Sequence, residues 1–140
     1  MPLLGGGGSG AGNPVGGTGG IGQTLNYVGD FVYAYSGAVE NAAGGSGSPS
    51  TMLEFTTGSE IIDAKLYFGV QFAGANDTYF FIKVNDQQTM GITFVETGGG
   101  DNLTGNPIEF VIPPFSKVTI QWSIDGVTKN GFAMLSGRLH

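Results

Sequence analysis

The chain has 140 residues, a formal net charge of −6 and no cysteine. Its 11 acidic residues outnumber 5 basic ones, which opposes direct binding to nucleic acid, because phosphate recognition depends on Lys and Arg. Without cysteine there is no disulfide, thiolate metal site or cysteine nucleophile. Charged residues make up only 11% of the chain, so we expect partners to cover much of its surface; a surface rich in Ser, Thr, Asn, Gln and Gly is the alternative.

The chain starts with MPLLGGGGSG, which has neither the basic segment nor the apolar run of a secretory signal. No apolar run approaches the ~18 residues that a membrane-spanning helix needs. We therefore expect a protein that is made in a host cytoplasm without an export signal and that has no membrane span.

Residues 1–29 form a predicted N-terminal arm, because they carry no charge and 11 of the first 22 are glycine. Glycine loses much backbone freedom on ordering and offers no apolar area in return. The arm is thus expected to lie extended outside the folded domain and to become ordered only between subunits, where shared contacts offset the entropy loss. Its candidate assembly contacts are Leu3, Leu4, Val15, Ile21 and Tyr27.

The arm also contains the spacing G-x-G-x-x-G of dinucleotide sites, at Gly17, Gly19 and Gly22. That motif acts only between a strand and a helix, where the helix N-terminus holds the pyrophosphate. Neither element is expected here, so the sequence predicts no nucleotide cofactor.

The folded domain is predicted over residues 30–140 and starts with a strand at 30–40, followed by a loop at 41–50 rich in Gly and Ser. From Thr51 onward, apolar residues recur at every second position, the period of a strand with one buried face. Turns are expected at 85–88 and 125–131, and a loop at 96–106. The residues predicted to be buried are Phe68, Phe80, Ile82, Phe110, Ile120 and Trp122.

Alternation with one polar face is typical of antiparallel sheets that are solvated on one side. Eight or nine such strands and no helical period predict an all-β fold, a two-sheet antiparallel sandwich. An eight-stranded jelly roll is the expected topology, ahead of an immunoglobulin-like sandwich, whose Cys and Trp signature is missing.

No group of residues predicts catalysis or metal binding. The single histidine, His140, is the last residue given, and the acidic residues lack the spacing of a calcium loop. Glycosidases use a pair of opposed carboxylates, and candidates are Glu54 with Glu60 and Asp63, or Asp77 with Asp86 and Asp101. The sequence gives no distance between them, and acidic residues in turns are ordinarily solvated. We therefore expect no enzyme activity, no cofactor and no metal.

Aromatic residues on the strands allow two interpretations. A row of rings on a sandwich face can bind sugars; the alternative is a second packed face against the arm or another subunit, because aromatic residues are also enriched at protein interfaces. These residues are Tyr27, Tyr33, Tyr35, Tyr67, Tyr79 and Phe81. Near the end of the chain, Arg138 is expected either to pair with a carboxylate or to remain solvated.

Three segments, LEFTTGSEIIDAKLYF (53–68), NPIEFVIPPFSKVTI (106–120) and LSGRLH (135–140), together resemble small jelly-roll structural proteins of bacteriophage virions. The resemblance covers residues 52–140 and leaves the arm outside. It implies a capsid vertex (penton) or decoration protein, located in the virion, that forms a pentamer or trimer and contacts other virion proteins such as the major capsid protein. The alternative is a carbohydrate- or receptor-binding sandwich, for which a surface glycan would be the ligand.

Overall fold

The computed structural model describes residues 25–44, 47–71, 76–95 and 106–140. These residues form nine strands and no helix, which confirms the predicted all-β class. The strands are β2 (Asn26–Val28), β3 (Phe31–Tyr35), β4 (Val39–Gly44), β5 (Ser50–Thr56), β6 (Ile62–Val70), β7 (Thr78–Val84), β8 (Gln87–Phe94), β9 (Ile108–Ile112) and β10 (Lys117–Leu139).

The strands form two antiparallel layers that share β10. In the first layer, here called the β6 sheet, the order is β2-β3-β10-β6-β9. In the second, the β7 sheet, β10 lies between β5 and β7, and β8 pairs with β7. Since β5, β6 and β7 lie alternately in the two layers, their connections cross from one layer to the other.

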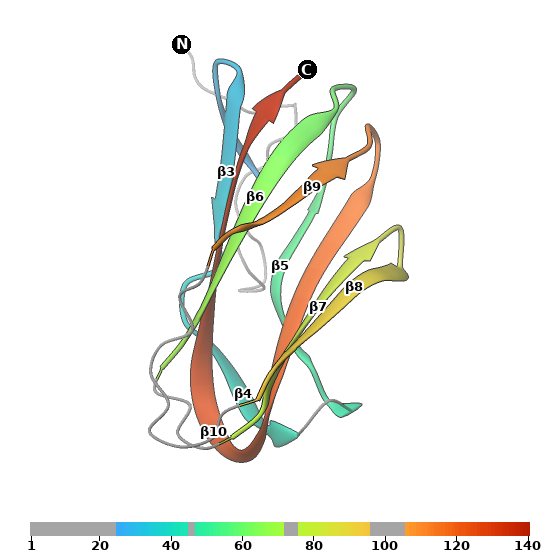
Figure 1. Cartoon of the computed structure of the whole chain (residues 1–140). Coiled ribbons are helices and arrows are strands. Elements are labelled where there is room, and N and C mark those ends of the chain that lie inside the picture. Colours follow the sequence, from blue (N-terminus) through green and yellow to red (C-terminus); the bar gives the residue numbers. More distant parts are fainter. Residues whose placement is uncertain (1–24, 45–46, 72–75, 96–105) are drawn as a thin grey trace.

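Strand β10 joins the two layers by a bend. Its residues 117–124 pair with β5 and β7, its residues 131–139 pair with β3 and β6, and the part between them pairs with β4. Figure 1 shows this as a U-shaped ribbon whose orange and red halves belong to different sheets. The register shifts between Asp125 and Thr128, where Gly126 has a φ of 73°, a conformation that favours glycine. The turn expected at 125–131 is therefore a bend within one strand.

The core lies between the two layers, as expected for a sandwich. The ring of Phe68, in the β6 sheet, stacks on that of Phe80, in the β7 sheet, with centroids 4.0 Å apart. Phe68, Phe80, Ile82, Ile120 and Trp122 are buried as predicted. Phe110 is only half-buried, which corrects the prediction, because β9 is an edge strand where the two layers open.

Two predicted boundaries also need correction. Leu25 is buried, and β2 pairs with β3, so the domain begins at or before Leu25 rather than at residue 30. The predicted loop 41–50 in fact begins within β4, which extends to Gly44. Asn41 explains this extension, because its buried amide donates to the carbonyl oxygen of Ser48 and accepts from the backbone N–H of Ile124.

The turn expected at 85–88 is present as a two-residue hairpin turn between β7 and β8. Asn85 and Asp86 both have positive φ, 52° and 64°, as a type I′ turn requires. The Asn85 side chain accepts a hydrogen bond from the backbone N–H of Lys117 at 2.9 Å, which ties the hairpin to β10.

The close approach of Gly131 to Trp122 gives a test of the core. A Cβ atom at residue 131 would lie 2.5, 2.7 and 2.9 Å from three atoms of the Trp122 ring. Because a buried indole cannot withdraw, we expect Gly131→Ala to lower the free energy of unfolding by about 1–3 kcal/mol in chemical denaturation. Gly58→Ala is the control, since no atom lies within 4 Å of its added Cβ. Equal stability of the two variants would contradict this packing.

Candidate functional site

Of the predicted assembly contacts, only Tyr27 is among the described residues; Leu3, Leu4, Val15 and Ile21 lie outside them. Tyr27 is in β2, half-buried, and packs against the core of its own domain. Burial raises the pKa of its hydroxyl, a hydrogen bond with the backbone of Gly58 lowers that pKa, and the charge of Glu60 raises it. Tyr27 therefore belongs to the folded domain and not to a separate arm.

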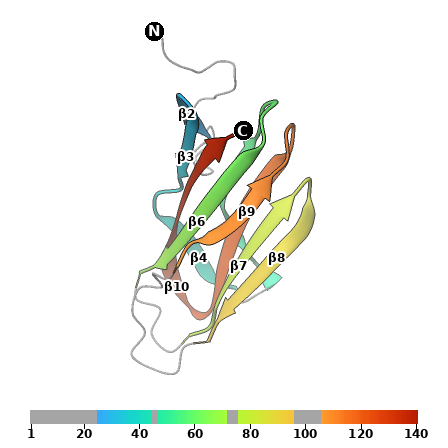
Figure 2. The same ribbon diagram turned by 45° about the horizontal axis from the view of Figure 1, so that its top comes forward.

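One candidate site is a cleft at the edge of the sandwich, here called the edge cleft. It has a volume of about 230 Å³ and is lined by residues of β7, β8 and β9, which all lie toward the right of the molecule in Figures 1 and 2. Among the described residues, none of those that line it is charged. Its lining residues are Ile82, Val84, Thr89, Met90, Phe110, Val111 and Pro113.

The edge cleft exists because both sheets end on the same side of the molecule. Among the described strands, β8 pairs only with β7, and β9 pairs only with β6. Met90 is 36% exposed and Val111 is 62% exposed, so apolar side chains flank the opening. Unpaired edge strands next to exposed apolar side chains are typical of surfaces that bind another chain.

A second candidate site is the outward face of the β6 sheet, where β3, β10 and β6 present side chains in register. In one row across the strands, Arg138 of β10 lies between Phe31 of β3 and Asp63 of β6. In another row, Met134 of β10 lies between Tyr35 of β3 and Tyr67 of β6. We call this surface the ring face; it comprises Phe31, Tyr33, Tyr35, Asp63, Lys65, Tyr67, Phe132, Met134, Ser136 and Arg138.

The ring face contains two hollows. One, of about 440 Å³, is lined by residues that include Phe31, Tyr33, Ser136 and Arg138. The other, of about 320 Å³, is lined by residues that include Tyr67, Gly69, Phe132 and Met134. Tyr35 lines both hollows, so they adjoin. Ser136 and Gly69 are small residues in rows otherwise built from large ones, which leaves room above them.

The charged groups of the ring face are balanced. Lys65 forms an ion pair with Glu109 at 3.1 Å, and the hydrogen bond and charge of Glu109 raise the pKa of Lys65. The Arg138 guanidinium carbon lies 5.8 Å from the centre of the Phe31 ring. Among the described residues no carboxylate is within ion-pair distance of Arg138, so the first of its two predicted alternatives, a carboxylate partner, is not found there.

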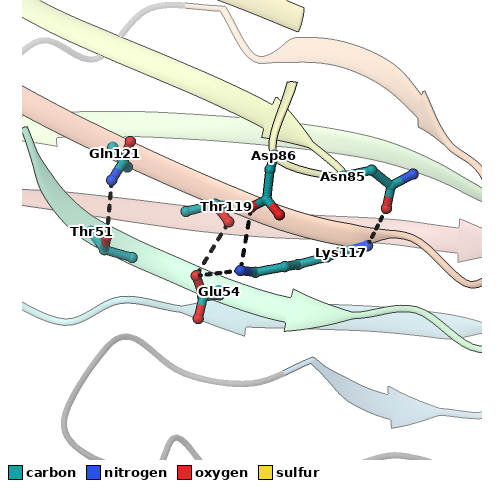
Figure 3. Close-up of polar contacts among 7 residues, drawn as sticks. All are labelled: Thr51, Glu54, Asn85, Asp86, Lys117, Thr119 and Gln121. Carbon is teal, nitrogen blue, oxygen red and sulfur yellow. Dashed lines mark hydrogen bonds and ion pairs between the residues drawn. The ribbon is translucent and has the colours of Figure 1, made fainter. Parts of the chain in front are cut away.

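The outward face of the β7 sheet has a different character, because polar side chains bond one another there (Figure 3). Lys117 Nζ lies 3.5 Å from Glu54 Oε2 and 3.4 Å from Asp86 Oδ1, and Thr119 donates to the same Glu54 oxygen. Hydrogen bonding to Asp86 and the charge of Glu54 raise the pKa of Lys117. Gln121 donates to Thr51 Oγ1 at 3.1 Å. These contacts link β5, β10 and the β7–β8 turn, and we interpret them as structural.

The other residues considered for chemistry are also engaged within the fold. The backbone of His140 forms hydrogen bonds with that of Ile61, and the Tyr79 hydroxyl donates to Asp125 Oδ2 at 2.7 Å. That hydrogen bond raises the pKa of Tyr79, and burial raises it further. Within the described residues no three His, Asp or Glu side chains lie close enough to hold a metal. Nor does that part of the chain contain a helix long and apolar enough to cross a bilayer.

A scan against models of protein families finds no match to this chain. A search of curated proteins finds no similar protein. The resemblance to phage virion proteins therefore stays a prediction.

Proposed function

We propose that the protein is a structural component of a virion, a vertex (penton) or decoration protein of the capsid, which assembles as a homo-oligomer. The assignment to a virion rests on the sequence resemblance of residues 52–140. The strand order supports it: β3, β10, β6 and β9 in one layer and β5, β10, β7 and β8 in the other fit an eight-stranded jelly roll in which β10 fills two positions.

The observation that carries the assembly proposal is the edge cleft. The described lining residues are uncharged and fit the uncharged residues 1–24, which the predicted arm retains after the corrected domain boundary and whose larger apolar side chains include Leu3, Leu4, Val15 and Ile21. Full burial of one such side chain contributes roughly 1.5–3 kcal/mol. The flanking glycines carry no side chains and let the arm backbone run close to the cleft walls.

We commit to the arm of a neighbouring copy as the occupant of the edge cleft. Fixing the backbone of each arm residue costs about 1–2 kcal/mol in conformational entropy. The burial of one apolar side chain therefore offsets the ordering of only the residues next to it. Several anchors spread along the arm, each in contact with neighbouring subunits, would hold it as a whole. In this arrangement the arm links copies of the chain into a particle.

Met90→Lys tests the proposal, because it puts a charge at the mouth of the edge cleft on a side chain that is already 36% exposed. We expect the variant to fold but to lose self-association, measured by sedimentation velocity, since burying an unpaired ammonium group is costly. Thr93→Lys is the matched control, because Thr93 is exposed on the same strand and pairs with Tyr79 on the opposite face. An oligomer that tolerates both substitutions equally would contradict the edge cleft as the contact.

A further inference from the structure

The ring face combines features that the edge cleft lacks. Its two hollows share Tyr35 and lie one after the other along the strands, from Phe31 past Tyr35 to Phe132. Phe31 is 60% exposed and Tyr35 is 50% exposed. Large rings this accessible, beside polar side chains, are typical of a binding surface.

We propose that the ring face binds a neutral polysaccharide, with successive sugar units lying along the two hollows. A pyranose ring has apolar C–H faces and a rim of hydroxyl groups. Tyr35 and the rings beside it can pack against the C–H faces. Three polar residues line the first hollow and can bond the sugar hydroxyl groups: Asp63 as an acceptor, Arg138 as a donor and Ser136 as either.

The charges of this surface favour a neutral ligand. The basic groups Lys65 and Arg138 are matched by the acidic groups Asp63 and Glu109, which lie beside them in the strand register. Lys65 is already paired with Glu109, and Arg138 lies against the Phe31 ring. An anionic glycan would find no surplus of positive charge here.

The shape of the surface favours a chain of sugars over a second copy of this protein. Ser136 lines one hollow between Tyr33 and Lys65, and Gly69 lines the other beside Phe132, so each hollow contains a residue smaller than its partners in the register. A slender ligand can enter such a depression along its length. A second copy of the protein, packed here through a sheet face, would need side chains that project into both hollows at once.

The experiment uses the full-length protein and a panel of neutral oligosaccharides: cellohexaose, chitohexaose, xylohexaose, maltohexaose and laminarihexaose. Binding is measured by isothermal titration calorimetry, and amide chemical shifts locate the site. We expect at least one oligosaccharide to bind and to shift residues of β3, β6 and β10. Tyr35→Ala is expected to weaken that binding about tenfold or more, which corresponds to about 1.4 kcal/mol.

Phe132→Ala is a second variant at the far end of the second hollow, and Phe115→Ala is the control, because Phe115 is 74% exposed and does not line either hollow. No binding to any of the five oligosaccharides would overturn the proposal. So would binding that both hollow variants leave unchanged, or loss of self-association in Tyr35→Ala, which would make the ring face a protein contact. The proposal does not depend on the edge cleft, and Met90→Lys should bind the oligosaccharide normally.

Discussion

Replacement of Trp122 by alanine is expected to lower the free energy of unfolding by about 3–5 kcal/mol. Trp122 is fully buried, and its ring is stacked with that of Phe80, with centroids 6.4 Å apart. Its Nε1–H donates to the carbonyl oxygen of Val39 at 3.0 Å, which holds the start of β4 against β10. The substitution therefore removes both the largest core side chain and a hydrogen bond between strands.

Chemical denaturation of three variants separates these contributions. Trp122→Phe keeps a ring but cannot donate to Val39, so we expect a loss smaller than that of Trp122→Ala. Phe115→Ala, at an exposed site, should stay within about 0.5 kcal/mol of the parent protein. If Trp122→Ala were as mild as Phe115→Ala, the two layers would not pack as described.

Deletion of residues 1–22 is expected to abolish self-association while the remaining domain still folds. The described core begins at Leu25, so every buried apolar residue of that core is retained. The deleted residues include all four apolar side chains assigned to the edge cleft, and without them the cleft has no occupant. Sedimentation velocity should show monomers only.

Thermal melting followed by circular dichroism provides the control for this deletion. A cooperative transition close to that of the full chain is expected, since the deletion removes none of the described core residues. A shortened protein that no longer folds would show that the arm is part of the domain. One that still forms the full oligomer would make the arm a passive linker and would favour the binding-module alternative.

The period of two along the strands was enough to predict the buried face of the sandwich. Ile120 and Trp122 alternate with Thr119 and Gln121, and the apolar pair is fully buried. This works because successive side chains of a strand point to opposite faces, so the sequence alone determines which set faces the core.

The bend of β10 was not predicted, because Gly126 and Gly131 resemble the glycines of a reverse turn. The chain does turn there, but the ladder continues because β4 pairs along the bend. The partner strand β4 was itself missed, since residues 41–44 are small and polar and show no apolar alternation. Its position depends on long-range contacts: the backbone ladder with β10, the hydrogen bond from the Trp122 indole to Val39, and the bonds of Asn41 to residues such as Ile124.

The candidate sites were predicted only in part. The sequence indicated only that six aromatic residues could form either a row of rings on a sandwich face or a packed face against another chain. In the structure Tyr33, Tyr35 and Tyr67 lie in the β6 sheet, whereas Tyr79 and Phe81 lie in the β7 sheet. The sequence did not indicate that Tyr35 and Tyr67 lie in one row with Met134 between them, which depends on the register of β3, β10 and β6. The edge cleft was also missed, since it depends on both sheets ending on the same side.

The contact between arm and edge cleft is tested most directly by disulfide cross-linking, for which a chain without cysteine is a clean background. One preparation carries Met90→Cys, and the others carry Leu3→Cys, Leu4→Cys, Val15→Cys or Ile21→Cys singly. Each arm variant is mixed with the Met90→Cys protein under mild oxidation, and Thr93→Cys replaces Met90→Cys in the control. We expect at least one arm variant to form a covalent heterodimer with the Met90→Cys protein and not with the Thr93→Cys protein. Equal cross-linking to both positions, or none to Met90→Cys, would contradict it.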